Sequence, residues 1–332
     1  MKRALLLSVV IIFSGISSLF ALDNKFENYF SFSLTPRFEI ASGVINEYVF
    51  DQNCKNTDNK LSQLDWNIKP LAIFNLKVDF DIMKYGFLSL SGSLAVPQRT
   101  DFMQDYDWEN SIGDQLGYDS WLEDDPTENT SFSEHVNHLD KYINYQISVG
   151  GNIYLPLEIK ITPYAAYYYE FIKFSSSQGY GLYKWNDFET YPFVGKVIAY
   201  EQQINTVLFG INIKADTIPH TSININFNIS PNMAKLNAID YHLTRSIAFN
   251  DRFNNFTLIN SEVTAFYRFT KNHKAGFTGK IQYIPLIKGD TYQGTINNDA
   301  EMISNDWTKA ATDGGGTERL IWTIGFNYSF SL

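Results

Sequence analysis

The chain has 332 residues, a net charge of −10 at pH 7 and one cysteine. The acidic balance argues against a nucleic-acid-binding protein, in which a basic stripe is expected. Because Cys54 is the only cysteine, an internal disulfide and a cysteine-based metal site are excluded.

The N-terminus has the pattern of an export signal. A basic leader, Lys2-Arg3, precedes an apolar stretch that ends near a small residue suited to cleavage, Ala21. The apolar stretch is shorter than the roughly 20 residues that a membrane-spanning helix needs. We therefore predict a signal peptide over residues 1–21, whose removal takes the net charge to −12.

Most of the remaining chain alternates between apolar and polar residues. The run SININFNIS at 222–230 is one of the clearest, and similar runs occur at 75–82, 207–214 and 319–332. Because successive side chains of a strand point to opposite faces, each run has one apolar and one polar face. A soluble β-sandwich would alternate in the same way. The export signal, the 16% aromatic content and the aromatic C-terminal run favour a membrane barrel.

About ten strands are expected from these runs. They span residues 29–50, 60–82, 86–100, 138–155, 157–174, 190–214, 221–240, 252–270, 274–289 and 318–331. Tight and long connections alternate between them, which is typical of short periplasmic turns and long extracellular loops. The predicted fold class is therefore all-β: a ten-stranded antiparallel transmembrane β-barrel with long extracellular loops. Residues 22–332 are predicted to form one outer-membrane barrel domain, because an open sheet edge in lipid would leave backbone groups unpaired.

Two pairs of polar residues suggest chemistry. Asp240 and His242 follow the strand at 221–240, and their two-residue spacing places both side chains on one side of the chain. That side is the lumen if no bulge intervenes. Asp105 and Asp107 have the same spacing after the third strand, which lies nearly across the barrel from the seventh. The two pairs are expected to face each other at the extracellular rim.

Such an arrangement suits hydrolysis by an activated water molecule. His242 would accept a proton from the water, Asp240 would orient and stabilise the imidazolium, and the facing carboxylates would position the water. No metal is needed. On pattern alone, the ten acidic residues from Asp101 to Glu128 also suit a solvated loop or a calcium site.

The chain resembles the omptins, a family of outer-membrane endopeptidases on a ten-stranded barrel. The stretches that carry the resemblance are SQLDW at 62–66, DYDW at 105–108, SEHVNHLDKYINY at 133–145, PFVG at 192–195 and DYHL at 240–243. Residue by residue, the resemblance implies that Asp240 and His242 form the water-activating dyad. It implies that Asp105 and Asp107 form the facing pair.

The resemblance also implies an acidic pocket that takes Arg or Lys before the cleaved bond. Glu47 matches one acidic pocket residue, but the second acidic position is occupied by Ala238. Loss of one carboxylate weakens the attraction for a cation. Both residues are predicted to bind substrate, with basic residues as one candidate preference at the cut site.

A second departure concerns lipid. The family carries a Tyr-x-Glu-x-Arg element that helps to bind lipopolysaccharide, whereas residues 167–171 read YYYEF. We predict that no cofactor is needed and that lipopolysaccharide dependence is lost. A small shift of register that gives Glu170 the role of the missing glutamate is the alternative.

The sequence therefore predicts an outer-membrane endopeptidase that cleaves peptides or proteins at the cell surface. Cationic substrates and the outer-membrane lipid are the expected partners, and nucleic acid is not. The alternative is a surface adhesin or ligand-binding barrel with weak or no catalysis, motivated by Ala238 and by the long loops at 101–137 and 290–317. A diffusion porin is less favoured, because ten strands enclose little lumen compared with the roughly 16–18 of porins.

Overall fold

A computed structural model describes residues 30–51, 59–108, 129–297 and 306–331. The predicted signal peptide at residues 1–21 and Cys54 lie outside the described residues. Within the described part of the chain, no helix is long and apolar enough to cross a membrane.

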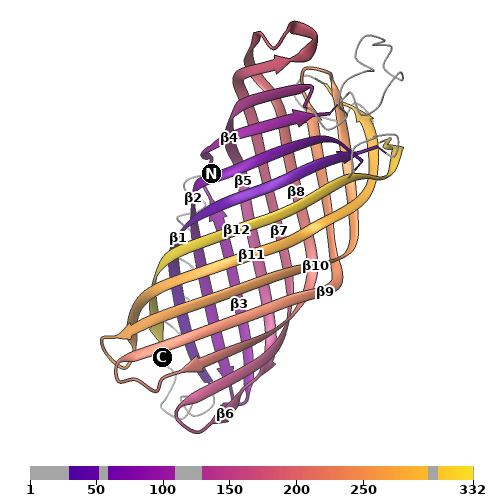
Figure 1. Ribbon diagram of the computed structural model, residues 1–332. Helices are drawn as coiled ribbons and strands as arrows, with labels where there is room; N and C mark the ends of the chain where they lie inside the picture. The colour runs from indigo at the N-terminus through magenta and orange to yellow at the C-terminus, as the bar shows by residue number, and fades with distance from the viewer. Residues whose placement is uncertain (1–29, 52–58, 109–128, 298–305, 332) are drawn as a thin grey trace.

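The described residues form one antiparallel sheet that closes into a ring (Figure 1). Its strands are β1 (Phe30–Phe50), β2 (Lys60–Ile82), β3 (Gly86–Ala95), β4 (Gln98–Asp107), β5 (Ser131–Gly151), β6 (Ile153–Leu155), β7 (Ile159–Tyr183), β8 (Thr190–Ala215), β9 (Thr221–His242), β10 (Ile247–Arg268), β11 (His273–Thr295) and β12 (Thr308–Ser331). A short 3₁₀ turn, η3 (Lys184–Asn186), lies in the β7–β8 hairpin. Pairing of β1 with β12 closes the ring. The prediction of an all-β antiparallel barrel is confirmed.

The predicted count of ten differs from the twelve strands of the described residues, although ten positions around the ring are filled. β3 and β4 lie end to end between β2 and β5. The break between them falls at Pro97, which has no N–H to donate to the ladder. β6 continues β5 beside β7 after a break at Asn152, whose side chain bonds to Asp81 and to the backbone of the neighbouring turn.

The strands are longer at the long-loop end than the sequence predicted. β4 runs to Asp107, β5 begins at Ser131 and β7 continues to Tyr183. The β9–β10 connection contains only residues 243–246. The prediction ended β4 and β7 too early and began β5 and β10 too late, because the apolar alternation stops there while backbone pairing continues.

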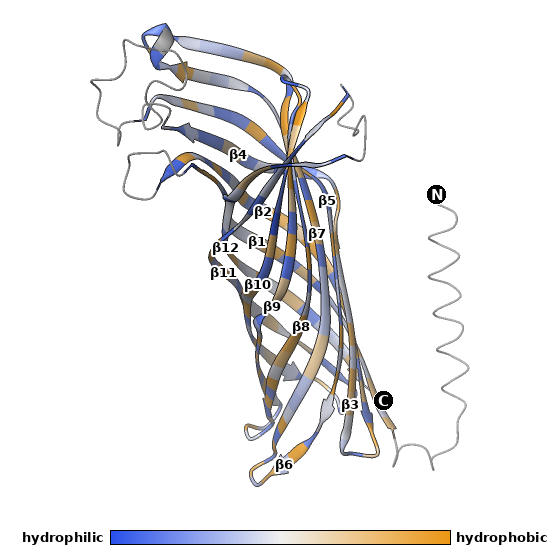
Figure 2. Cartoon of the chain, turned by 90° about the vertical axis from the view of Figure 1, so that its right-hand side faces the viewer, coloured by the Kyte–Doolittle hydropathy of each residue, from blue (hydrophilic) through white to orange (hydrophobic). Residues whose placement is uncertain are grey.

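A band of large apolar side chains covers the outside of the barrel. Among the exposed ones are Phe38, Phe74, Leu76, Ile147, Phe209, Ile225, Phe277, Ile281, Trp322, Ile324 and Phe326. Figure 2 shows the matching alternation of hydrophobic and hydrophilic residues along the strands. On β12 the band runs from Leu320 to Tyr328, and on β10 it includes Val263 and Tyr267. Residues 308–317 of β12 and 247–253 of β10 therefore lie beyond the band that suits lipid.

Polar side chains fill the lumen inside this band. The Arg319 guanidinium donates to the Glu170 carboxylate, and it also donates to Gln282 at 2.8 Å and to Gln202 at 2.5 Å. Arg319 and Glu170 are both 2% exposed. Glu170 therefore points into the barrel and away from lipid, so the alternative reading that gave it a lipid-binding role is wrong.

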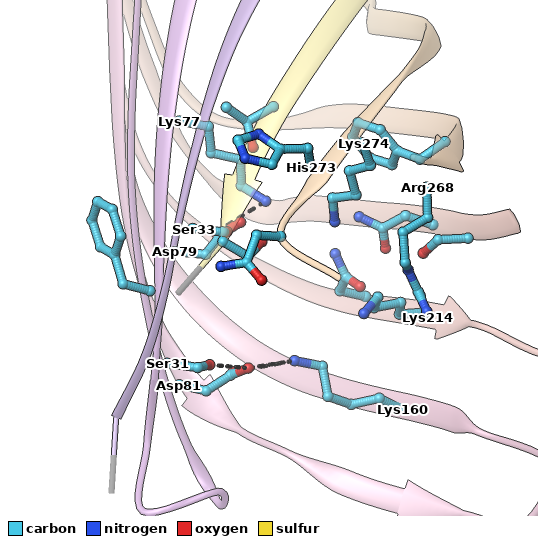
Figure 3. A pocket seen from close by; sticks show the side chains of 18 of the residues that line it. Ser31, Ser33, Lys77, Asp79, Asp81, Lys160, Lys214, Arg268, His273 and Lys274 are labelled. Carbon is cyan, nitrogen blue, oxygen red and sulfur yellow. Dashed lines mark hydrogen bonds and ion pairs between the residues drawn. The ribbon is translucent and has the colours of Figure 1, made fainter. Parts of the chain in front are cut away.

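At the short-turn end, charged residues surround a cavity of about 280 Å³ (Figure 3). Lys160 contacts Asp81 at 3.0 Å and Lys77 contacts Asp79 at 3.1 Å. Lys214, Arg268 and Lys274 enter the cavity from neighbouring strands (Figure 3). These side chains lie at the opposite end of the barrel from Asp240 and His242, so this cavity is separate from the candidate site.

The buried Arg319–Glu170 pair should be required for barrel stability. Replacing only Arg319 by Met leaves a buried carboxylate without its cation and should cost about 3–5 kcal/mol of unfolding free energy. The double replacement Arg319→Met with Glu170→Leu should cost clearly less, because no charge is left unpaired. Urea unfolding in lipid vesicles measures both, and equal losses in the two variants would contradict this account.

Candidate active site

Asp240 and His242 both point to the lumen side near the end of β9. Between the pairs Asn205–Lys235 and Phe209–Ile229, β9 has two residues more than β8. A two-residue irregularity keeps the parity of a strand, so the even positions face inward both below and above it. The sequence prediction assumed that no bulge intervenes; an irregularity is present, but its even number of residues leaves Asp240 and His242 on the predicted lumen side.

The Asp240 carboxylate and the His242 imidazole are in direct contact. Asp240 Oδ2 lies 2.6 Å from His242 Nε2, and the two side chains are 6% and 21% exposed. The ring of His242 packs edge-on against Phe249, with 5.5 Å between centroids. The second oxygen of Asp240, Oδ1, is buried and has no hydrogen-bond partner among the described residues.

Asp105 and Asp107 lie on β4 itself and not on a loop. Ser62 donates a hydrogen bond of 3.3 Å to Asp105, and Ser131 donates one of 2.6 Å to Asp107. The neighbouring strands β2 and β5 thus fix both carboxylates. Since β4 pairs on both sides, the aspartates are held by sheet geometry and stay on one face of the strand.

The two pairs influence each other electrostatically. Burial raises the pKa of Asp105 well above its usual range, and the charges of Asp107 and Asp240 raise it further. β9 stands four ring positions from β4, through β5, β7 and β8. The charge of Asp240 therefore acts on Asp105 across the lumen. Burial and the neighbouring negative charges therefore all favour the protonated form of Asp105.

A layer of aromatic rings lies next to these groups. Trp66 of β2 stacks on Tyr200 of β8, with centroids 5.2 Å apart, and on Phe174 of β7, with centroids 5.9 Å apart. All three rings are fully or almost fully buried. Tyr200 pairs in the ladder with Asp240, so this layer lies directly beside the dyad.

The two predicted substrate-binding residues lie on the same face as the dyad. Glu47 of β1 is 3% exposed and accepts a hydrogen bond of 3.1 Å from Trp66. Burial raises the pKa of Glu47, and so do the charges of Asp240 and Asp251. Ala238 of β9 is 2% exposed and lies two residues before Asp240. The structure therefore brings all six sequence-predicted residues to one end of the barrel.

The sequence prediction missed Asp251 of β10. Its backbone pairs with Ala238, and its carboxylate accepts a hydrogen bond of 2.5 Å from Thr291. The residue is 6% exposed. Burial raises the pKa of Asp251 to about 7; the Thr291 hydrogen bond opposes the rise and the charge of Asp240 adds to it.

No cluster of His, Cys, Asp and Glu with the geometry of a metal site occurs among the described residues. The calcium reading of the stretch from Asp101 to Glu128 depends mainly on residues 109–128, which lie outside the described part of the chain.

Proteins of similar sequence identify the family. The model of the Omptin family matches residues 30–330. The chain belongs to the omptin family. A plasminogen activator of Yersinia pestis is 28% identical over 294 residues, which cover 83% of this chain and 86% of that protein. The outer membrane protease IcsP of Shigella flexneri is 23% identical over 277 residues, which cover 79% and 82%.

A solved structure agrees with the fold. The crystal structure of the outer membrane protease OmpT from Escherichia coli matches with a TM-score of 0.77 at 18% identity, covering 91% of this chain and 97% of that chain. The omptin chain described here is thus an outer-membrane endopeptidase with an extracellular active site, as the resemblance predicted. The long-loop end of the barrel is the extracellular end.

The aromatic layer should stabilise the extracellular half of this omptin. Trp66→Ala removes a buried ring and should lower the unfolding free energy by about 3–5 kcal/mol. Val194→Ala is the control, since Val194 is 91% exposed and its removal leaves no cavity. Urea unfolding in lipid vesicles compares the two, and equal unfolding midpoints would show that the layer adds nothing to stability.

Proposed function

We propose that this omptin hydrolyses peptide bonds with a water molecule activated by Asp240 and His242, opposite Asp105 and Asp107. The observation that carries the proposal is the 2.6 Å contact between Asp240 and His242 on the same wall of the lumen. A histidine held by a carboxylate is a suitable general base, because its proton affinity lies near neutral pH and its ring is fixed in orientation.

In this proposal the two ring nitrogens have different roles. Nε2–H of His242 donates to Asp240, 2.6 Å away, and Nδ1 accepts a proton from water. The water oxygen then bonds to the peptide carbonyl carbon as its proton moves to Nδ1. The imidazolium passes that proton to the amide nitrogen, and the C–N bond breaks. Asp240 stabilises the imidazolium between these two steps.

Asp105 and Asp107 have a different role in this proposal. Because the raised pKa of Asp105 favours its protonated form, Asp105 donates a hydrogen bond to the water or to the developing oxyanion. Asp107 remains the acceptor of the pair and is held by Ser131. This division gives one acidic and one basic carboxyl group without a metal ion.

Basic side chains are the proposed preference next to the cleaved bond. Glu47, Asp240 and Asp251 place negative charge at the extracellular end of the lumen. A cationic substrate is attracted by such a field and is concentrated near the site.

Removing the dyad should abolish most of the activity while the barrel still folds. His242→Ala and Asp240→Ala should each lower kcat by about 10²–10⁴-fold, as expected for a lost acid–base group. The measurement is cleavage of an internally quenched peptide library by protein refolded in vesicles. His138→Ala is the matched control, since His138 lies on the other face of β5. Undiminished cleavage by His242→Ala would rule out the mechanism.

We also propose that activity needs no lipopolysaccharide. The outer face of residues 167–171 presents Tyr167, Tyr169 and Phe171, and Lys141 lies over the Phe171 ring at 5.1 Å. This surface keeps a cation but lacks the paired carboxylate of the family element, because Glu170 faces the lumen.

Activity in phosphatidylcholine vesicles should therefore equal activity in vesicles that also contain lipopolysaccharide. The measurement is kcat/KM for one peptide at a fixed protein-to-lipid ratio. Activity that appears only after lipopolysaccharide is added would contradict the proposal.

A further inference from the structure

One buried carboxylate of the site has no place in the family pattern. Asp251 of β10 is the ladder partner of Ala238, the position at which the second acidic residue of the pocket is missing. We propose that Asp251, together with Glu47, binds the arginine or lysine side chain next to the cleaved bond and so replaces the missing carboxylate from the neighbouring strand. The inference rests on the proposed endopeptidase function and names the substrate class of that site.

A bulge turns Asp251 toward the lumen. Below it, the even residues of β10 face inward, as Glu262 and Thr264 do. Asn254 pairs with Lys235 and Phe256 pairs with Ala234, so Asn255 is an extra residue with a positive φ of 58°. One extra residue reverses the parity of a strand. Above the bulge the odd residues therefore face inward.

The next two strands of the ring, β11 and β12, make room for the carboxylate. A β-carbon at Gly315 of β12 would lie 2.2 Å from Cγ of Asp251, so only glycine leaves this space open. Thr291 of β11 donates to one carboxylate oxygen and fixes the rotamer. Three strands thus contribute to placing this one side chain, which is the pattern of a built site.

Neither carboxylate of the proposed pair has a cation of its own. Among the described residues, no Lys or Arg forms an ion pair with Glu47 or Asp251, in contrast to Glu170 and Glu262 deeper in the barrel. Glu47 uses one oxygen for Trp66, and Asp251 uses one for Thr291. The second oxygen of each has no hydrogen bond to the described residues.

A third group points to the same ligand. Asp240 is 4% exposed, and its oxygen Oδ1 is buried without a partner. The negative charges of Asp240 and Asp251 both act on Glu47. Because buried like charges repel one another, an incoming guanidinium or ammonium group stabilises all three carboxylates at once. Neutral side chains gain nothing comparable, so the preference is a property of charge and not of size.

The first test compares two peptides that differ only in arginine or citrulline before the cleaved bond. Wild-type protein should cleave the arginine peptide with a much higher kcat/KM. Asp251→Asn should lower the ratio of the two kcat/KM values by about 10–100-fold, since a nearly buried partner of the cation is lost. Asp290→Asn is the matched control, because Asp290 is paired with Lys309 on the outside of the neighbouring strand. Its ratio should equal that of the wild type.

The second test moves the carboxylate from β10 to the ladder-partner position on β9. The double variant Asp251→Ala with Ala238→Asp should recover most of the ratio that Asp251→Ala alone loses. An unchanged ratio in Asp251→Asn, or no recovery in the double variant, would overturn the role of Asp251. In that case the wild-type protein would still cleave the peptides. If the proposed function itself were wrong, the wild-type protein would cleave neither peptide.

A third measurement needs no variant. Three titratable groups of the described residues interact with the charge of Asp251: Glu47 of β1, Tyr200 of β8 and Asp240 of β9, which is paired with His242. Thr291 and Gly315 add only neutral contacts. Arginine stays charged and citrulline stays neutral between pH 6 and pH 8. As Asp251 loses its proton near pH 7, the arginine-to-citrulline ratio should rise. A ratio independent of pH would count against the assignment.

Discussion

The closed ring of backbone hydrogen bonds is the constraint on which the rest of this structure depends. In lipid, every N–H and C=O group must find its partner inside the protein, and pairing of β1 with β12 removes the last free edge. Once the ring is closed, the register decides which residues face the lumen. Asp240 and His242 are therefore presented inward by the strand itself, and their geometry does not depend on a loop.

Much of this arrangement could be predicted from the sequence because lipid forces a strict alternation. The outward apolar positions of β9 and β12 are visible in the sequence as every second residue. The strand ends beyond the apolar band were less predictable. There the outer face meets water, so the alternation disappears although β4 continues to be paired as far as Asp107. The candidate aspartates were assigned to a loop, whereas they lie on β4.

Asp251 shows a different limit of sequence reasoning. Counting by twos from Glu262 places residue 251 on the outer face. The single extra residue at Asn255 reverses that result. Asparagine tolerates the left-handed conformation better than most residues, so Asn254-Asn255 is a weak local sign of a bulge. A sign of that kind does not tell whether one or two residues are inserted, and only the odd number changes the face. On β9 the number of inserted residues is even, so Asp240 lies on the side that the sequence predicted.

The distribution of charge separates the two halves of the lumen. Within the apolar band, Arg319 is paired with Glu170 and Arg37 with Glu262, so these groups satisfy each other. At the extracellular end, the charge of Asp251 acts on Glu47, and neither carboxylate forms an ion pair with a Lys or Arg of the described residues. Buried carboxylates without partners reduce stability. A bound cationic ligand would offset this loss of stability. On the proposal made above, substrate charge acts at the unpaired end and not in the paired middle of the lumen.

A binding site requires charge at a position in space and not at a position in the chain. The side chains of ladder partners lie about 4.5–5.5 Å apart at their β-carbons. A carboxylate on β10 can therefore lie in nearly the same place relative to the dyad as a carboxylate on β9. Ala238, taken alone, suggested a weakened pocket and gave the adhesin hypothesis its motive. With Asp251 directly opposite, the same substitution is compatible with an active endopeptidase whose preference for basic side chains is preserved by another strand.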